Sequence, residues 1–197
     1  MAKLIFRAAT LAVLLLSLGP ISWAQPQSET PKQTDEYCSQ AAAYAAAHAG
    51  EAILFSATPR NKNPADDAWK RSTSSAEFQN AVRNADSTAR VILRDGHAVF
   101  ADFVFQNQFG DSKESAQYCF RPDGSLARLH SELDSYHGGM KVVRDYEYDS
   151  DGRVVSHRMQ SFDLENGNPK PLPRDFWDQP PPVFHRASEM PFRKDLR

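Results

Sequence analysis

Two histidines in this sequence stand beside carboxylates at spacings that acid–base or metal chemistry uses. His130 and Glu132 form an H-x-E pattern, in which a glutamate handles the proton next to a zinc-bound histidine. Zinc deaminases also need a Pro-Cys-x-x-Cys segment downstream, and no cysteine follows Cys119. His157 and Asp145 form a second pair, which a β-hairpin would hold together as a general base. Either pair would suit a hydrolase, although such pairs are more often ordinary polar contacts on a solvated sheet.

The segment from Glu147 to Gly152 places oxygen donors at alternate positions, like the start of an EF-hand calcium loop. The twelfth position of such a loop is a bidentate glutamate, but Arg158 occupies it here and would repel the ion. The glycine motifs of nucleotide-binding loops and the GxSxG and HExxH motifs are absent. The sequence therefore predicts no catalytic residue, no metal ion and no cofactor, and it favours a protein that is not an enzyme.

Tyrosine and arginine side chains form the most suggestive binding surface of the sequence. These residue types contribute much of the binding energy at protein interfaces, and a flat ring beside a guanidinium also suits sugars and anions. Tyrosine is also a good strand former, so the pattern is compatible with an ordinary sheet surface. The candidate binding residues are Tyr118, Arg128, His130, Arg144, Tyr146 and Arg158.

The first 24 residues have the order of a secretory signal peptide. Lys3 and Arg7 precede an apolar run at residues 8–18, and small residues lead up to Ala24. The apolar run is about half of the ~20 residues that a membrane-spanning helix needs. We expect cleavage after Ala24, where no nearby cysteine is available to carry a lipid. The sequence thus predicts a periplasmic or secreted protein without a transmembrane anchor.

The mature chain, residues 25–197, has the balance of a single globular domain with a tail. The full sequence has 197 residues, of which 24% are charged and 41% hydrophobic. Removal of Lys3 and Arg7 leaves 21 basic against 25 acidic side chains, a net charge of −4. This balance gives no electrostatic basis for binding nucleic acid. We expect the partner to be an envelope protein or a glycan.

Export makes a disulfide the expected state of the two cysteines, Cys38 and Cys119. They are 81 positions apart, and neither metal ligands nor CxxC redox pairs use such a spacing. On the chain-entropy model, closing a loop of about 80 residues stabilises a fold by roughly 4–5 kcal/mol. The sequence therefore predicts a structural Cys38–Cys119 bridge.

The mature chain is expected to begin with a polar linker at residues 25–34, followed by helices at residues 35–86. An alanine-rich stretch up to Ile53 favours helix, and its small side chains would let it lie close to a sheet with the first cysteine on the buried side. Ser74 and Glu77 form a capping box, which predicts the start of a further helix.

Glycine turns recur with a period of 28 residues in the second half of the expected domain, which spans residues 35–168. Asp-Gly pairs stand at Asp95-Gly96, Asp123-Gly124 and Asp151-Gly152. We infer three consecutive hairpin units, at residues 84–111, 112–139 and 140–167. The sequence therefore predicts an α+β fold in which N-terminal helices pack on a six-stranded antiparallel β-meander.

Two of these units share a local string. Residues 118–126 and 146–154 both read Tyr-x-aromatic-x-x-Asp-Gly-x-aliphatic. This string resembles the tyrosine–aspartate (YD) repeats of bacterial RHS-type surface proteins and MORN-like β-hairpin arrays, and the likeness covers residues 84–167. The resemblance implies stacked antiparallel hairpins and no specific activity.

Side chains alternate between the faces of a strand, so a repeat of 28 residues keeps equivalent residues on one face. On this basis the odd-numbered residues form an apolar face that the helices cover, and the even-numbered residues carry the candidate binding surface. A one-residue slip at Gly138-Gly139 would exchange the faces beyond it. The expected apolar set is Val91, Leu93, Val99, Ala101, Phe103, Phe105, Cys119, Leu129, Leu133, Val143, Val155 and Met159.

Prolines and aromatic residues share the C-terminal arm, residues 169–197. Seven of the thirteen prolines lie between Pro169 and Pro191, which excludes a central strand or a helix interior. The arm also carries Phe184 and Phe192, which a pure spacer would not need. We expect the arm to dock these side chains on the domain, and a polyproline ligand for a partner is the alternative.

Together these features favour a non-enzymatic binding or interaction module of a bacterial cell envelope. One alternative is an envelope hydrolase that uses one of the two histidine–carboxylate pairs. Another is a carrier of an apolar ligand held between sheet and helices, with Phe103, Phe105 and Met159 lining the site.

Overall fold

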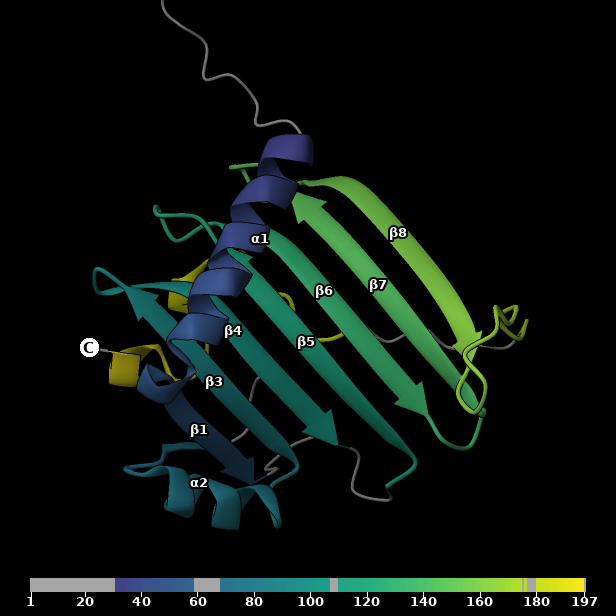
Figure 1. The fold of residues 1–197 in the computed structure, drawn as a ribbon, viewed down its shortest axis with the longest axis horizontal. Coiled ribbons are helices and arrows are strands. Elements are labelled where there is room, and N and C mark those ends of the chain that lie inside the picture. Colours follow the sequence, from purple (N-terminus) through teal and green to yellow (C-terminus); the bar gives the residue numbers. More distant parts are fainter. Residues whose placement is uncertain (1–30, 59–67, 107–109, 175, 177–179, 197) are drawn as a thin grey trace, which may run out of the picture.

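The computed structural model describes residues 31–58, 68–106, 110–174, 176 and 180–196. A single eight-stranded antiparallel sheet forms its centre; the helix α1 crosses one face of this sheet and the C-terminal arm follows the opposite face (Figure 1). The expected α+β class is therefore confirmed. The expected signal peptide at residues 1–24 and most of the expected linker lie outside the described residues.

The first described element is α1, Pro31–Ala47, which begins inside the expected linker and ends earlier than the alanine-rich pattern predicts. A 3₁₀ turn at Ala49–Glu51 follows, and the chain then enters strand β1, Ile53–Thr58. The helix ends here because the chain must reverse into the sheet at Ile53. None of the described helices is long and apolar enough to cross a membrane.

Two strands occur where the sequence predicted only helices. β1 pairs with β3, Ser87–Arg94, and places Phe55 opposite Ala89. β2, Ala68–Arg71, pairs with the other edge of β1. The sheet thus has eight strands rather than the expected six. Sequence reasoning missed β1 because its six residues show little alternation of polar and apolar side chains. β1 becomes a strand by pairing with β3, which lies about thirty residues further along the chain.

The helix α2, Ser75–Val82, follows β2 and begins at the expected cap. Ser74 Oγ accepts a hydrogen bond from the Glu77 amide at 3.1 Å, and the Glu77 carboxylate accepts one from the Thr73 amide at 2.7 Å. The hydrogen bonds from Thr73, helped by Lys70, lower the pKa of Glu77 to about 2.

The other strands form a meander of consecutive antiparallel neighbours, so the order across the sheet is β2-β1-β3-β4-β5-β6-β7-β8. Gly96, Gly124 and Gly152 lie in the reversals with φ of 79°, 80° and 80°, a left-handed conformation that glycine adopts without strain. The strands are β4, His97–Gln106; β5, Ser112–Phe120; β6, Leu126–Ser135; β7, Met140–Tyr148; and β8, Val154–Asp163.

The β5–β6 and β7–β8 hairpins repeat the same backbone contacts 28 residues apart. The amide of Arg121 donates to the carbonyl of Ser125 at 2.8 Å, and the amide of Asp149 donates to the carbonyl of Arg153 at 2.9 Å. Both hairpins also contain a register shift at the matching place, between residues 119 and 120 and between residues 147 and 148. The two reversals therefore have the same local structure.

The expected division into one odd and one even face is wrong. Residues that pair across β4 and β5, such as Phe103 and Ala116, are one odd-numbered and one even-numbered, and this recurs in the later strand pairs up to their register shifts. On one and the same face of the sheet, β4 and β6 therefore place their odd-numbered residues, whereas β5 and β7 place their even-numbered residues. As a result the expected apolar set is split, with Phe103 and Leu129 on one face and Cys119 on the other.

The main core lies on the face that the C-terminal arm covers, which we call the arm face. Phe184, Met190 and Phe192 of the arm are buried there, so the arm is docked, and the expectation that helices cover this face is wrong. Phe192 stacks on Phe55 with ring centroids 3.9 Å apart, and the ring centroids of Phe103 and Phe184 are 5.4 Å apart. Aromatic side chains of an irregular segment thus close the core.

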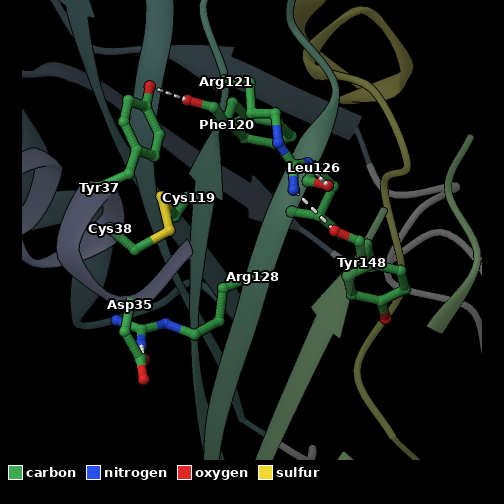
Figure 2. The surroundings of a disulfide bond; sticks show 9 residues. All are labelled: Asp35, Tyr37, Cys38, Cys119, Phe120, Arg121, Leu126, Arg128 and Tyr148. Atoms are coloured by element: carbon green, nitrogen blue, oxygen red, sulfur yellow. Dashed lines mark hydrogen bonds and ion pairs between the residues drawn. A yellow bond between two sulfur atoms is a disulfide. The ribbon is translucent and has the colours of Figure 1, made fainter. Parts of the chain in front are cut away.

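The opposite face, which we call the helix face, is joined to α1 by the expected disulfide. Cys38 and Cys119 are bonded with Sγ–Sγ 2.12 Å, so the predicted bridge is confirmed (Figure 2). Around the bridge only small or short side chains of α1 are buried, among them Ala41 and Ala45. Tyr37 on the same helix donates a hydrogen bond to the carbonyl of Phe120 at 2.7 Å.

Candidate functional site

The helix face carries a continuous row of polar side chains across six strands, which we call the polar row. Each member stands directly opposite the next one in the antiparallel register of β3 to β8. Side chains at opposite positions of neighbouring strands lie on the same face and touch. The polar row consists of Arg90, Asp102, Gln117, His130, Asp145 and Arg158.

Hydrogen bonds and ion pairs join most neighbours in the polar row. Asp145 is its best-connected member, because one carboxylate oxygen lies 2.8 Å from His130 Nδ1 and the other 3.3 Å from an Arg158 nitrogen. At the β3 end of the row, a guanidinium nitrogen of Arg90 lies 3.8 Å from a carboxylate oxygen of Asp102. His130 also extends the contacts sideways, since its Nε2 lies 3.6 Å from Glu132. The carboxylate of Glu132 in turn accepts from Lys141 at 2.8 Å.

The pKa values of the carboxylates on this face are shifted in two opposite directions. Burial raises the pKa of Asp145, but the hydrogen bonds and charges of His130 and Arg158 outweigh it, so the net pKa lies below its usual value. The Lys141 hydrogen bond likewise lowers the pKa of Glu132. Burial raises the pKa of Asp102, and the Arg90 charge only partly opposes that rise.

A hollow of about 260 Å³ lies beside α1 over the middle of the polar row. Its lining combines the disulfide and apolar side chains of α1 and β4 with polar side chains of β5, β6 and β7. One lining residue, Arg128, reaches the Asp35 carboxylate of α1 at 2.6 Å (Figure 2). The lining residues are Cys38, Ala42, Phe100, Gln117, Cys119, Arg128, His130 and Asp145.

The arrangement supports two kinds of chemistry. A histidine whose Nδ1 is held by a carboxylate is oriented to take or give a proton at Nε2, which is the geometry of a general base. A row of alternating donors and acceptors can also form many weak hydrogen bonds with a polar partner. Within the described residues, no group of three His, Cys, Asp or Glu side chains is arranged to hold a metal ion.

The structure divides the six candidate binding residues between the two faces. Arg128, His130 and Arg158 lie together on the helix face, in or next to the polar row. Their expected companions Tyr118 and Arg144 are fully buried on the other face. The sequence therefore grouped residues that the sheet separates.

The three candidates on the arm face have structural contacts. The Tyr118 hydroxyl donates to the carbonyl of Pro182 at 2.5 Å, which ties β5 to the arm. Arg144 pairs with Glu114 at 3.1 Å, and Tyr146 stacks on His157 with ring centroids 4.2 Å apart.

The expected pair of His157 with Asp145 does not form. His157 stands opposite Tyr146 and therefore lies on the arm face, whereas Asp145 points to the helix face and binds His130. The correct histidine–carboxylate cluster joins His130 to both Asp145 and Glu132, and so it contains the H-x-E pair of the sequence. Only the register of β6 against β7 reveals this cluster.

Two members of the polar row, Asp102 and Gln117, were missed by sequence reasoning. Neither belongs to a motif, and they are brought beside His130 only by the pairing of three strands. In the segment that resembles a calcium loop, Asp149 Oδ1 accepts hydrogen bonds from the amides of Asp151 and Arg153. This carboxylate thus stabilises the hairpin turn itself.

Comparison with family models, with curated proteins and with solved structures finds no match to this chain. Fold and site therefore define the protein only as a class. It is an α+β protein with one eight-stranded sheet, an apolar face closed by a C-terminal arm and a polar face crossed by a disulfide-linked helix.

Proposed function

We propose that this protein is an exported, non-enzymatic binding module of the bacterial cell envelope, and that it binds its partner through the helix face. The observation that carries the proposal is the polar row, because α1 covers its middle while its β8 end reaches the surface, with the Arg158 side chain 69% exposed. The disulfide fits an oxidising compartment outside the cytoplasm.

The partner that suits this surface is an envelope protein or a glycan. The open end of the polar row offers a guanidinium at Arg158 and a carboxylate at Asp145, and the Glu132 carboxylate lies beside the row on β6. Together these groups donate to and accept from hydroxyl and amide groups. Exposed ion pairs contribute little to folding stability, so their side chains can exchange partners at small cost. Nucleic acid is a poor partner, because carboxylates alternate with the cations.

The hairpins that carry the row are proposed to be repeats of one 28-residue unit. The matching turn hydrogen bonds and register shifts of β5–β6 and β7–β8 support this for residues 112–139 and 140–167. In this view the resemblance to tyrosine–aspartate hairpin arrays concerns architecture, and the polar row is a feature added on one face.

The proposal is tested by native mass spectrometry of the protein exported by its own host, with Arg158→Ala beside a matched control. The control is Arg153→Ala, which removes the same side chain type from the adjacent turn, where Arg153 pairs with Asp149 and Asp151. We expect a bound glycan or protein that the wild type and R153A retain and that R158A loses by roughly tenfold. A wild-type spectrum without a partner, or equal retention by both variants, would contradict the proposal.

A second candidate function, an envelope hydrolase, is favoured by the 2.8 Å contact of His130 Nδ1 with Asp145. In this role His130 would remove a proton from water at Nε2, and Asp145 would hold the ring. Turnover of an envelope ester or glycan by the wild type, reduced at least ~100-fold in His130→Gln, would support it. The apolar-carrier alternative has less support, since Phe103 and Phe105 pack against each other and Phe103 against the arm.

A further inference from the structure

The two edges of the sheet are protected to very different degrees. At one edge β2 is four residues long, and its charged side chains are engaged: Lys70 pairs with Glu77 at 3.0 Å, and Arg71 donates to the carbonyl of Asp195 at 3.0 Å. At the other edge β8 is ten residues long (Figure 1). Short strands and engaged charges are how natural sheets prevent edge pairing, and β8 lacks the first of these.

The C-terminal arm covers only the last part of β8. The amide of Lys170 donates to the carbonyl of Ser161 at 3.0 Å, and Phe162 forms an isolated bridge with Pro169. From Val154 to Gln160 no described residue pairs with the outer edge, and every side chain in this stretch is exposed. Seven residues of backbone are therefore open to another strand.

This open stretch also carries most of the large exposed apolar side chains of the described residues. Val154 is 53% exposed, Val155 52% and Met159 37%, and Tyr136 in the β6–β7 turn is the fourth of this set. An edge that combines unpaired backbone with apolar side chains is a template for strand addition.

We propose that residues Val154–Gln160 of β8 form an antiparallel contact with the same residues of a second copy, joining two sheets edge to edge. The central residue of the open stretch is His157, so full overlap of two copies places His157 beside His157 of the second copy. In that register Val155 of each copy meets Met159 of the other, so the apolar side chains at the two ends of the stretch cover each other.

The same register is compatible with the charges of the strand. Arg158 stands opposite Ser156 of the second copy rather than opposite another arginine, and each Arg158 already has Asp145 of its own chain at 3.3 Å. Val155 is the extra residue of a β-bulge, because Glu147 stands opposite Ser156 and Tyr148 opposite Val154. The bulge lies at one end of the shared stretch, so the pairing around its centre stays regular.

The length of the contact predicts a weak dimer. Seven antiparallel residues span about 24 Å, which is short for an interface of standard size. We therefore expect a reversible, concentration-dependent dimer rather than an obligate one. Sedimentation equilibrium of the mature protein at concentrations from about 10 µM to about 1 mM should show a monomer–dimer transition.

Charge substitutions at the open edge test the location of the contact. Val155→Lys and Met159→Lys should each weaken dimerisation by roughly tenfold or more, because an exposed lysine blocks strand addition. Tyr136→Lys is the matched control, since it adds the same charge at a similarly exposed residue of the β6–β7 turn, outside the open stretch of β8, and it should leave the transition unchanged. Circular dichroism of all three variants should match the wild type, because each position is exposed.

A single-cysteine experiment tests the register. His157→Cys should form a disulfide-linked dimer on mild oxidation, since opposite residues of antiparallel strands have Cα atoms about 4.5–5.5 Å apart, within disulfide range. Tyr136→Cys should remain unlinked under the same conditions. A wild type that stays monomeric up to about 1 mM, an equal effect of Tyr136→Lys, or linkage of Tyr136→Cys alone would each overturn the proposal.

Discussion

The two faces of the sheet are stabilised by different means. On the arm face aromatic side chains interlock, as where Phe103 contacts both Phe184 and Phe192. On the helix face α1 packs small side chains such as Ala41 and Ala45 on a few apolar residues of the sheet, among them Phe100, beside the polar row, and a disulfide holds it there. The comparison teaches that the regular helix of an α+β protein need not close its core; here an irregular, proline-rich arm does so.

The largest effect is expected from breaking the disulfide that joins α1 to β5. Replacing Cys38 and Cys119 together by alanine should lower the free energy of unfolding by roughly 4–5 kcal/mol, because the loop between them becomes free in the unfolded chain. Since the apolar side chains that α1 buries are small, such as Ala41 and Ala45, amide exchange within Pro31–Ala47 should accelerate more than in the strands. Urea unfolding and hydrogen-exchange mass spectrometry measure both, and unchanged protection of α1 would show that packing alone holds it.

A nearly equal loss is expected from emptying the aromatic core of the arm face. Phe103→Ala should lower the free energy of unfolding by about 4 kcal/mol, since it removes a buried ring and leaves a cavity among Phe184, Phe192 and Trp69. Val154→Ala, at an exposed position of β8, is the control and should change stability by less than about 0.5 kcal/mol. Similar urea midpoints for the two variants would refute the assignment of the main core to this face.

Ion pairs on the two faces should differ in energetic weight. Arg144→Ala removes the cation that pairs with Glu114 on the arm face, where the Arg144 side chain is 0% exposed, and should cost about 3 kcal/mol. Lys141→Ala removes a comparable contact with Glu132 on the open helix face and should cost less than about 1 kcal/mol. Chemical unfolding of both variants decides the point, and equal losses would mean that the polar face is as well shielded as the core.

The smallest expected effect is on the pH dependence of folding stability, to which two carboxylates of the polar row contribute with opposite signs. The lowered pKa of Asp145 means that its ionised form stabilises the fold above the ordinary value near 3.8, and that this stability is lost as the pH falls through the lowered pKa. Asp102 acts in reverse, because its raised pKa makes ionisation unfavourable in the folded state at neutral pH, and protonation relieves this cost.

Two amide substitutions separate these contributions. Asp145→Asn should be less stable than the wild type at pH 7 and should converge with it in strong acid, below the lowered pKa. Asp102→Asn should be at least as stable as the wild type at pH 7, with the difference again vanishing in acid. Urea midpoints measured from pH 7 down to about pH 1 test both, and parallel curves for the two variants would contradict the opposite pKa directions.

Features that depend on local chain chemistry could be predicted from the sequence. Asp123-Gly124 and Asp151-Gly152 form turns because glycine accepts the positive φ that these reversals require. Ser74 and Glu77 cap α2 through hydrogen bonds between near neighbours. The Cys38–Cys119 bridge was predicted from a cysteine count of two together with the expected export of the chain.

The candidate site could be predicted only in part. His130 and Glu132 were found because they are two positions apart on one strand, and Arg128 and Arg158 were found as residue types. Asp102, Gln117 and the true partner of Asp145 were not found, because strand register joins them across long stretches of sequence. The sequence analysis placed the six candidate residues on one face. In the sheet, odd-numbered residues of one strand stand opposite even-numbered residues of the next from β5 to β8, and this divides the six between the two faces.

The sequence by itself determined the helix-forming alanine stretch, the reversals, the single cysteine pair and an aromatic arm that a spacer would not need. These depend on backbone preferences, side-chain volume and redox environment, which act over a few residues or on composition. Only the tertiary structure decided that β1 and β2 extend the sheet, that the arm rather than the helices covers the aromatic face, and that a polar row crosses the other. The physical reason is that each of these depends on which residues of distant strands stand opposite one another, and a shift of one residue exchanges every side chain between the buried and the polar face.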